Sequence, residues 1–385
     1  MAKKNQFDLI IVGGGILGSF YAFHALQMGL EVALFEKENK AHGSSVRNFG
    51  QIVPSGFNSK WQVFGLKSIE IYKQLMGLGD FGIVNNGSLY ISSNEEESKL
   101  LEELAAINQK NGYSSQLLSK NETLKKYSGI NKEYLKSALF FPDEFSVDPI
   151  KFSNQFLSYL FSFKKFHYFS NTLIVKTKIE GKWCEAKDML KNKYYADKII
   201  ITSGYEFEIL FPKIFRESSL DLVKLQMMRI KGSKSFGLDV NLLTGDTIRR
   251  YESFTECPSF KEIKAKENKN SLQQKMGIHM LFKKELNGNI IVGDSHEYAP
   301  IQLKSNLDFY IKENINEYFK SQTLRILKLK ELHVIDTWIG YYSQNKKDDI
   351  FCKTIDNKIH IITGIGGKGM TAGPGFTFYD LKNVL

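Results

Sequence analysis

The sequence is poor in cysteine and in long apolar runs, and each shortage excludes a class of protein. The three cysteines, Cys184, Cys257 and Cys352, are far apart and have no metal-type spacing, so we predict reduced thiols and no metal site. No apolar run approaches the ~18 residues that a membrane helix needs. Lys3 and Lys4 precede an apolar stretch, but no small-residue cleavage site follows it. We therefore expect a cytoplasmic protein without a transmembrane segment.

Arginine is scarce although the chain is strongly basic. The formal net charge is +10, but the lysines are scattered along the chain with acidic residues between them, which predicts no nucleic-acid-binding stripe. Because a guanidinium grips carboxylates and phosphates with a planar two-point fork, arginine in a lysine-rich chain is a candidate for binding anions. The candidates are Arg47, Arg216, Arg229, Arg249, Arg250 and Arg325.

Length and composition are those of a globular protein with more than one domain. A chain of 385 residues is longer than most single domains, and 42% apolar residues suffice for a large core. Two domains are therefore expected. Composition leaves the oligomeric state open.

The stretch after the N-terminal lysines has the pattern of a nucleotide-binding unit. An apolar run, Leu9 to Val12, leads directly into Gly13, Gly15 and Gly18, so the GxGxxG pattern lies where a strand would turn into a helix. The first glycine permits the tight turn, the second lets the backbone approach a pyrophosphate, and the third lets the helix pack on the strand. Apolar residues then recur at helical spacing up to Leu30. The phosphate would lie at the positive end of this helix.

A carboxylate closes the predicted second strand of this unit. Glu36 follows the alternating stretch Glu31 to Phe35 and lies about 20 residues past the glycines. There it can accept hydrogen bonds from ribose hydroxyls, and it would repel the extra phosphate of NADP. A glycine-rich turn without a nucleotide is the alternative. The complete order of strand, glycines, helix, strand and glutamate favours a dinucleotide.

Residues 42–56, HGSSVRNFGQIVPSG, form a polar and glycine-rich segment. Its alternative is a long surface connection, but Val46, Phe49, Ile52 and Val53 make it too apolar for a freely solvated loop. We expect this segment to lie along the bound cofactor.

The middle of the chain alternates between helical and strand patterns. We expect helices at 60–76, 95–111, 149–163 and 305–319, a charged linker at 261–275, and a strand pair within 81–92. Further strands are expected at 166–169, 172–179, 183–187, 194–203, 276–282, 289–293 and 331–341. Asn287-Gly288 is a strong hairpin turn. The buried strand at 194–203 would return the chain to the nucleotide-binding sheet.

The candidates for substrate binding lie between residues 224 and 298. Arg229 falls on one face of a predicted strand, KLQMMRIK, and Arg250 and Tyr251 follow in a region of mixed polarity. At least one of the two arginines is expected to clamp an anionic group, with a surface ion pair as the alternative for each. His279 and His296 are candidates for orienting substrate or moving protons, with a structural role as the alternative.

The C-terminal stretch at 359–375, IHIITGIGGKGMTAGPG, joins an apolar strand to a glycine-rich loop and a closing helix. Glycine allows the backbone to approach a flat ligand and to aim successive amides at it. A flexible linker is the alternative, but a buried strand leads into the loop and no further domain follows. We therefore expect a loop that faces the cofactor.

Together these motifs resemble the FAD-dependent amine and amino-acid oxidases, which include D-amino-acid oxidase, glycine oxidase and sarcosine oxidase. The resemblance spans nearly the whole chain and rests on the GxGxxG unit with Glu36, the GSSVRN segment, the strand YYADKIIITSG and the C-terminal GIGGKGMTAGPG. It implies an α/β fold, α+β overall, in which a Rossmann-like FAD-binding domain carries a discontinuous substrate domain with a mainly antiparallel sheet. The implied limits are 1–83, 146–217 and 334–385 for the FAD-binding domain, and 84–145 and 218–333 for the substrate domain.

A closer likeness concerns the motifs HGSSVRNFGQIVPSG, KLQMMR, RRYESF and GDSHEY. They resemble the branch of this superfamily that is encoded in bacterial phosphonate-breakdown gene clusters. This likeness implies an aminoalkylphosphonate or an N-methylated aminophosphonate as the substrate.

The resemblance also assigns the cofactor contacts. Gly13, Gly15, Gly18, Glu36 and Lys37 would bind the adenosine half of FAD. The pyrophosphate and the path toward the isoalloxazine would be lined by Ser44, Ser45, Arg47, Asn48 and Gln51. The pyrimidine end would meet Gly366, Gly367, Lys368, Gly369, Met370 and Thr371. The GYYSQ region after Trp338, where several relatives attach FAD, contains no cysteine, so noncovalent FAD is expected.

Amine oxidation by a flavin needs few catalytic groups. The C–H bond must be positioned for transfer of a hydride equivalent to flavin N5, and the resulting imine hydrolyses to a carbonyl compound. Charge that develops at the pyrimidine end would be stabilised by backbone amides, a helix start and Lys368. The residues expected to act on the substrate or the reacting atoms are Lys368, Arg229, Arg250, Tyr251 and His279.

Three alternatives remain at this level. The first is a glycine, sarcosine or D-amino-acid oxidase or dehydrogenase, with oxygen or another electron acceptor. The second is an NAD-dependent dehydrogenase, which the C-terminal loop and the GSSVRN segment disfavour. The third is a non-catalytic flavoprotein subunit.

Overall fold

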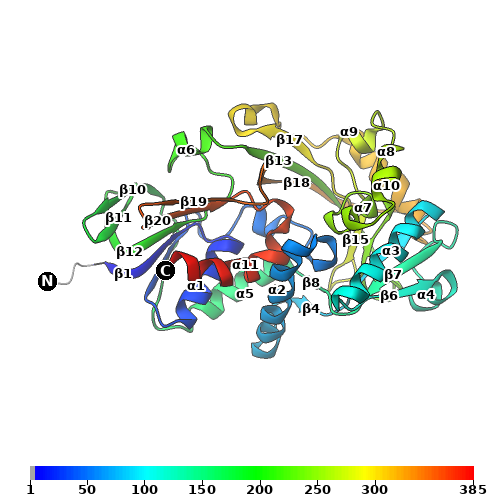
Figure 1. Cartoon of the computed structure of the whole chain (residues 1–385), viewed down its shortest axis with the longest axis horizontal. Coiled ribbons are helices and arrows are strands. Elements are labelled where there is room, and N and C mark those ends of the chain that lie inside the picture. The colour runs from blue at the N-terminus through cyan, green and yellow to red at the C-terminus, as the bar shows by residue number, and fades with distance from the viewer. Residues whose placement is uncertain (1–4) are drawn as a thin grey trace.

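A computed structural model describes residues 5–385, which form three sheets and the helices that cover them (Figure 1). The first sheet has a parallel centre in the order β9-β2-β1-β12-β20, to which antiparallel β10, β11 and β19 are added. The central strands are buried on both faces, which explains their continuous apolar sequences. The bounds are β1 Gln6–Val12, β2 Val32–Phe35, β9 Phe166–Phe169, β10 Ile174–Glu180, β11 Trp183–Asp188, β12 Lys193–Ile201, β19 Phe351–Ile355 and β20 Ile359–Thr363.

Four helices pack together beside the first sheet. They are α1 (Ile16–Gln27), α2 (Ser59–Leu78), α5 (Pro149–Leu160) and α11 (Gly369–Val384). Their shared core is aromatic: the rings of Phe20 and Phe156 lie 4.5 Å apart, and Phe152 stacks on both. Such packing fixes α1, and with it the glycine turn that precedes it.

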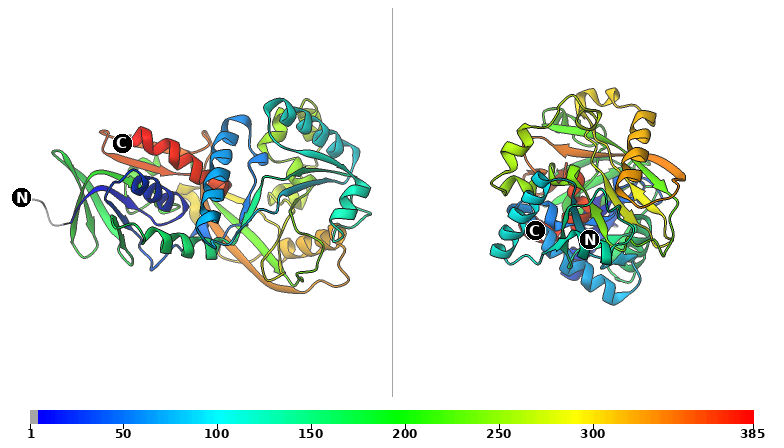
Figure 2. Two further views of the ribbon diagram at one scale, coloured as in Figure 1. Left: turned by 90° about the horizontal axis from the view of Figure 1, so that it is seen from below. Right: turned by 90° about the vertical axis from the view of Figure 1, so that its right-hand side faces the viewer.

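The second sheet has nine strands, nearly all antiparallel, in the order β17-β13-β16-β15-β14-β5-β7-β6, with β18 beside β13. The two sheets lie toward opposite ends of the molecule, as Figure 2 shows. The bounds are β5 Ser88–Ser92, β6 Gln116–Ser119, β7 Ser137–Phe141, β13 Leu220–Ile230, β14 Asn241–Leu243, β15 Leu281–Lys284, β16 Ile290–Val292, β17 Glu297–Pro300 and β18 Val334–Asn345.

Short elements join the two large sheets. A small sheet in the order β3-β8-β4 comprises β3 (Gln51–Ile52), β8 (Phe145–Val147) and β4 (Ile83–Val84). Strand β18 begins in the second sheet and ends beside β20, where Gln344 bridges to Ile365. The limits of the two domains stay a prediction.

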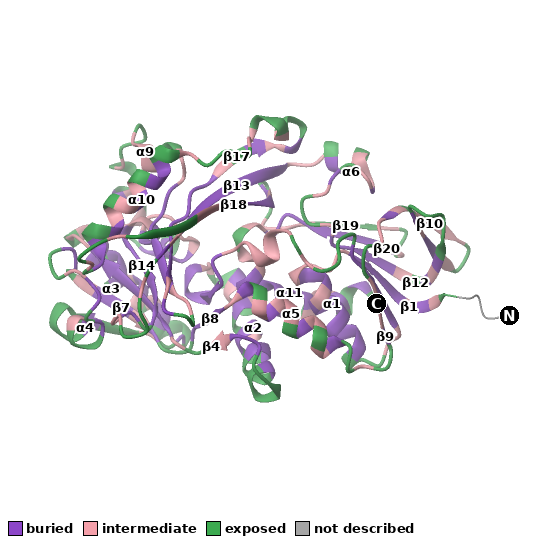
Figure 3. Ribbon diagram, turned by 180° about the vertical axis from the view of Figure 1, so that it is seen from behind, coloured by how far each residue is buried: buried purple, intermediate pink, exposed green. Residues whose placement is uncertain are grey.

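Most of the remaining helices cover the second sheet or its connections, whereas the one at 212–216 packs on the first sheet through buried Phe215, and several carry solvent-exposed residues (Figure 3). The α-helices are α3 Glu95–Asn111, α4 Lys120–Lys126, α6 Pro212–Arg216, α7 Gly245–Ile248, α8 Phe260–Ala265, α9 Leu272–Lys275 and α10 Glu313–Ile326. The 3₁₀ turns are η1 Ser44–Val46, η2 Pro54–Gly56, η3 Glu252–Glu256, η4 Ile301–Asn306 and η5 Gly366–Lys368. The predicted mixed α/β fold is thus confirmed.

Three local predictions were wrong. The charged stretch 261–275 is not a linker, because buried Ile263 anchors α8 and Ser271 caps α9. The helix expected at 305–319 begins only at Glu313, because the backbone of Lys312 is held by both polar atoms of the Gln226 side chain. The pair expected within 81–92 belongs to different sheets, since β4 pairs with β8 while β5 pairs with β7 and β14.

Among residues 5–385 no helix is both long and apolar enough to cross a bilayer.

Candidate functional site

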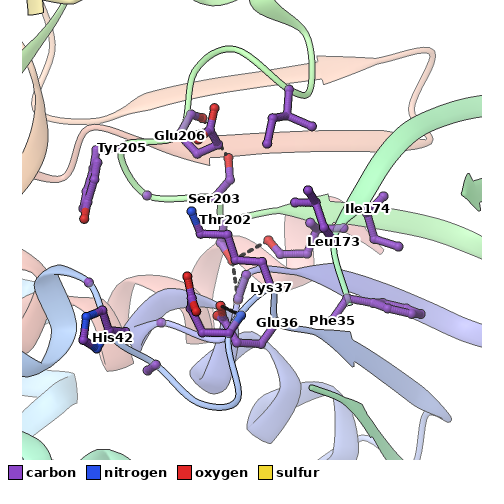
Figure 4. Close-up of a pocket in the computed structure, with 18 of the residues that line it drawn as sticks. Phe35, Glu36, Lys37, His42, Leu173, Ile174, Thr202, Ser203, Tyr205 and Glu206 are labelled. Carbon is purple, nitrogen blue, oxygen red and sulfur yellow. Dashed lines mark hydrogen bonds between the residues drawn. The ribbon is translucent and has the colours of Figure 1, made fainter. Parts of the chain in front are cut away.

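Two cavities meet where the first sheet ends. The glycine-turn cavity lies at the carboxyl ends of β1, β2 and β12 and is lined by Gly13, Glu36 and Thr202 among others (Figure 4). The arginine–histidine cavity extends from there to the second sheet and is lined by Arg250 and His279 among others. Their volumes, counted to the open mouths, are about 1030 and 1830 Å³. The two cavities adjoin, because they share the lining residues Gly15, Ser44, Ser45, Thr202 and Gly204.

The glycine turn is shaped by contacts that leave no room for side chains. Gly13 has φ +104°, and a Cβ there would overlap the carbonyl oxygen of Thr202. At Gly18 a Cβ would overlap the carbonyl oxygen of Gly13 and lie 2.7 Å from Thr202 Oγ1. Gly15 precedes α1, and it lines the arginine–histidine cavity together with Ile16 and Leu17 of the first helical turn. The positive end of this helix therefore faces the cavity.

Glu36 joins the end of β2 to the glycine turn. One carboxylate oxygen accepts a hydrogen bond from the Gly14 amide at 2.8 Å, and the other accepts one from Glu38 at 3.0 Å. The side chain is buried at the cavity wall, and the neighbouring Lys37 also lines the cavity. The spacing argument from sequence thus placed the carboxylate beside the turn.

The GSSVRN segment links the first sheet to the second. Ser45 Oγ accepts a hydrogen bond from the Ile16 amide at 2.8 Å, and Ser44 donates to the Tyr341 carbonyl. Asn48 braces the turn by donating to the carbonyls of Ser44 and Ser45. Gln51 then donates to the Phe282 carbonyl of β15. All predicted residues of the segment line the arginine–histidine cavity: Ser44, Ser45, Arg47, Asn48 and Gln51.

The C-terminal glycines have two different roles. Gly364 and Gly366 have positive φ and form the turn from β20, whereas Gly369, Gly373 and Gly375 belong to α11. A Cβ at Gly375 would overlap the Phe64 carbonyl of α2, so this glycine permits close helix packing. The expected closing helix is present, but it begins at Gly369, so the loop is shorter than the glycine content predicted. The predicted contacts nevertheless line the cavity: Gly366, Gly367, Lys368, Gly369, Met370 and Thr371.

Lys368 is engaged by carboxylates at the cavity rim. Its ammonium lies 2.7 Å from Glu252 and 3.6 Å from Asp349. It also lies 5.4 Å from the centre of the Trp61 ring. The charge of this lysine is therefore partly balanced by its neighbours.

The predicted arginines occupy different environments. Arg229 makes a two-point ion pair with Glu285 and a further one with Asp336, and it does not line either cavity. Arg250 lines the arginine–histidine cavity and donates to the Gly277 carbonyl and the Tyr298 hydroxyl, both at 2.9 Å. Within the described residues no carboxylate pairs with Arg250. Its guanidinium is thus available to an anion.

Two histidines flank a carboxylate beside Arg250. His279 Nε2 lies 2.8 Å from Asp294 Oδ1, and His296 Nε2 lies 3.8 Å from Asp294 Oδ2. Burial lowers the pKa of His279, and burial together with Arg250 lowers the pKa of His296 to about 3. Burial opposes ionisation of Asp294, but the histidines and Arg250 hold its pKa at about 2. At neutral pH the site therefore contains a carboxylate between two neutral imidazoles.

Tyrosines complete this wall. The ring of Tyr251 packs on Gly56, where a Cβ would meet it, and burial raises its pKa and that of Tyr342. Both phenols stay protonated. The sequence interpretation assigned no role to Asp294, Tyr298 or Tyr342. The polar stretch GDSHEY directly after the buried strand β16 could have indicated Asp294 and Tyr298. No sequence signal indicated Tyr342.

The chain matches the family model described as "FAD dependent oxidoreductase" over residues 8–376. One similar protein is a glycerol 3-phosphate dehydrogenase of Caloramator mitchellensis, 24% identical over 98% of this chain and 74% of that protein. A second is a glycerol 3-phosphate oxidase of Mycoplasma pneumoniae, 32% identical over 37% of this chain and 39% of that protein. A third is the mitochondrial sarcosine dehydrogenase of Mus musculus, 26% identical over 37% of this chain but only 16% of that protein.

Solved structures show the same fold. Glycine oxidase from Geobacillus kaustophilus superposes with a TM-score of 0.78 at 16% identity, over 99% of this chain and 95% of that one. The FAD-bound L-alpha-glycerophosphate oxidase from Mycoplasma pneumoniae gives 0.76 at 19% identity, over 99% and 95%.

Proposed function

We propose that this chain, which belongs to the FAD-dependent oxidoreductase family, oxidises the carbon next to an amine in a small substrate with an anionic group. The observation that carries the proposal is Arg250. Its guanidinium lines the cavity and has no carboxylate partner within residues 5–385. A bound phosphonate or carboxylate would supply that partner.

FAD is the cofactor of this family, and the cavity fits it. The two adjoining cavities offer room for both halves of a dinucleotide, and Gly15, Ile16 and Leu17 at the positive end of α1 line the space where a pyrophosphate would lie. We propose that the glycine-turn cavity takes the adenosine half and the arginine–histidine cavity takes the isoalloxazine. None of the three cysteines lines either cavity, which supports noncovalent binding. When bound, the flavin accepts a hydride equivalent from the substrate.

The protein's own contribution is to position the substrate and to manage its proton. Arg250 would hold the anionic group, while the protonated hydroxyls of Tyr251 and Tyr342 would donate hydrogen bonds. The buried Nδ1 of His279 has no hydrogen-bond partner in the described part of the chain, so a substrate proton could be held there. Gly369 begins the 16-residue helix α11, whose positive end would stabilise negative charge beside it, with Lys368 adding to this effect.

Within this proposal, the substrate is an aminoalkylphosphonate or its N-methyl derivative. The similar proteins are named for glycine, for sarcosine and for glycerol 3-phosphate. An aminoalkylphosphonate combines the amine of the first two with a dianionic head like that of the third. Arg250 would hold the dianionic head, and the neutral histidines would lie ready to interact with the amine.

A second candidate is oxidation of a hydroxyl group, as in glycerol 3-phosphate. The His279–Asp294 pair favours it, because an alcohol must lose its O–H proton and a neutral imidazole can accept one. The relative that spans 98% of this chain has this specificity in its name.

Anaerobic flavin bleaching distinguishes these candidates. The purified holoenzyme should be mixed with 2-aminoethylphosphonate, its N-methyl derivative, glycine, sarcosine, D-alanine and glycerol 3-phosphate. We expect fastest reduction by one of the phosphonates. Faster reduction by glycine or D-alanine would replace the phosphonate, and reduction by glycerol 3-phosphate alone would replace the amine. Reoxidation by oxygen or by a quinone then identifies the acceptor. A flavoprotein bleached by none of them would indicate a non-catalytic subunit.

A further inference from the structure

A second group of metal-binding side chains lies away from the cavities, where the last hairpin meets the C-terminal helix. In the antiparallel pair β19–β20, Thr354 lies opposite His360 and Cys352 lies opposite Ile362. Opposite residues share a face, as do residues two apart, so Cys352, Thr354 and His360 project from the same face. Helix α11 supplies Asp380 to this face.

The ligand atoms of these residues converge. The Cys352 sulfur, one His360 nitrogen and one Asp380 oxygen all lie within 4.8 Å of one another. His360 Nε2 is 3.1 Å from Asp380 Oδ2, yet Nε2 makes no hydrogen bond, so the N–H direction misses the oxygen. The His360 side chain is only 6% exposed. His360 Nε2 is therefore a buried nitrogen without a hydrogen-bond partner in the described residues, and it lies beside a carboxylate and a thiol that can share a metal ion with it.

Neighbouring hydroxyls fix both groups in this arrangement. The Thr354 hydroxyl is 2.9 Å from His360 Nδ1, which leaves Nε2 directed at the cluster. The hydroxyl of Tyr21, from α1, donates to Asp380 Oδ2. Metal-binding histidines and carboxylates in proteins typically have such outer partners.

The carboxylate of the cluster has no cationic side chain beside it within the part of the chain that the structure describes. No lysine or arginine of residues 5–385 pairs with Asp380, although its side chain is mostly buried. A cysteine thiolate and this carboxylate would together carry two negative charges, which one divalent cation balances. Two ligands that are each about 2.0–2.1 Å from a tetrahedral Zn²⁺ lie about 3.3 Å apart, close to the observed separation of nitrogen and oxygen.

We propose that Cys352, His360 and Asp380 bind one Zn²⁺ ion through Sγ, Nε2 and a carboxylate oxygen. Binding releases the thiol proton to solvent, which reaches exposed Cys352, and water takes the fourth position. The sequence interpretation missed this site because its residues are separated by a hairpin and a helix. The other cluster, His279, Asp294 and His296, also places three ligand atoms together, but the positive charge of Arg250 acts on all three and opposes a cation.

The ion would tie the C-terminal helix to the first sheet. Helix α11 begins at Gly369 beside the arginine–histidine cavity and carries Asp380 near its other end. Zn²⁺ at Asp380 would therefore stabilise this helix without taking part in flavin chemistry.

The test uses untagged, full-length holoprotein that has been treated with a chelator and dialysed. Titration with Zn²⁺ should give one bound equivalent and a higher Tm, and Co²⁺ should give ligand-field bands at longer wavelength than flavin absorption, with a thiolate-to-cobalt band. Cys352→Ser should abolish the thiolate band, whereas the matched control Cys184→Ser, at a buried cysteine outside the cluster, should keep it. Tyr21→Phe should weaken Zn²⁺ about 10–100-fold.

Flavin absorbance and circular dichroism show which variants fold. Asp380→Asn provides a second variant that keeps the side-chain shape, and it should also weaken Zn²⁺. Failure of the folded wild type to bind Zn²⁺ or Co²⁺ would overturn the proposal. So would unchanged binding by Cys352→Ser and Asp380→Asn.

Discussion

The two cavities differ in how far apart along the chain the contacting residues of their walls lie. In the glycine-turn cavity, the Glu36 carboxylate contacts the Gly14 amide, 22 residues earlier. In the arginine–histidine cavity, Ser44 bonds to a carbonyl 297 residues later, and Arg250, which follows α7, contacts a tyrosine 48 residues later on β17. The glycine turn and Glu36 belong to one local unit whose spacing reveals them, although residues 172–174 and 202–206 complete that wall, whereas the arginine–histidine wall exists only after both large sheets have formed. We therefore expect substitutions in the glycine-turn cavity to affect FAD binding and substitutions in the arginine–histidine cavity to affect substrate binding.

The strongest test of the glycine-turn cavity is Gly18→Ala. The added Cβ would overlap the Gly13 carbonyl and press on Thr202, so β1 and α1 must separate. We expect loss of FAD from the purified protein and about 1–3 kcal/mol lower stability. The control is Gly77→Ala in α2, where nothing lies within 4 Å and alanine favours the helix. The flavin-to-protein absorbance ratio measures the outcome; equal ratios in both variants would contradict this reading of the turn.

Arg250→Met tests the arginine–histidine cavity. Loss of a charge-assisted contact to the substrate anion should raise KM about 10–100-fold while FAD content stays unchanged. The matched control, Arg229→Met, removes a guanidinium that is bound by Glu285 and Asp336 outside both cavities. It should lower Tm and leave KM unchanged. Steady-state kinetics at a saturating concentration of electron acceptor provide the measurement. A raised KM in Arg229→Met but not in Arg250→Met would mean that Arg229, and not Arg250, binds the substrate anion.

The sequence predicted the glycine turn and its carboxylate because their signals are local, but it did not predict the parts of the cavity lining at 172–174 and 202–210. Gly13, Gly15 and Gly18 precede a helix after a buried strand, and Glu36 ends the next strand, so composition and spacing suffice. Arg229 shows why the second cavity was harder. Alternation placed it on a strand face, but the acids that pair with it come from elsewhere in the chain: Asp336 lies on β18 and Glu285 directly follows β15.

Glycine-rich sequence was ambiguous for a related reason. Gly366 has positive φ in a turn, whereas Gly375 lets α11 approach α2. Both uses need the absence of a side chain, and only the packed structure separates them. The overall fold was predictable because each strand and helix carries its own periodicity.

The histidines make the arginine–histidine cavity sensitive to acid. The pKa of His296 is about 3 in the folded state, against an ordinary value of 6.5. Below pH 6.5 the unfolded chain therefore binds a proton that the folded state does not, so the protein is destabilised as the pH falls. When the pH is lowered from 7 to 5, protonation of His296 in the unfolded chain should lower the free energy of unfolding by about 2 kcal/mol. His296→Asn should flatten that slope in urea unfolding at saturating FAD. The exposed-site control His333→Asn should retain it, and equal slopes in both variants would assign the acid sensitivity elsewhere.

Glu36→Gln gives the smallest effect and the sharpest separation between the cavities. Glutamine keeps one oxygen that can accept the hydrogen bond from the Gly14 amide. It loses the negative charge and the second oxygen, which in the wild type accepts a hydrogen bond from the Glu38 amide. We expect FAD to bind about 10-fold more weakly, the equivalent of one hydrogen bond to a charged group. Fluorescence titration of the apoprotein measures this. At saturating FAD the KM for the substrate should equal that of the wild type, because Glu36 lines only the glycine-turn cavity. A raised KM with unchanged FAD affinity would mean that the carboxylate acts on the substrate wall, and the division between a local cofactor cavity and a long-range substrate cavity would fail.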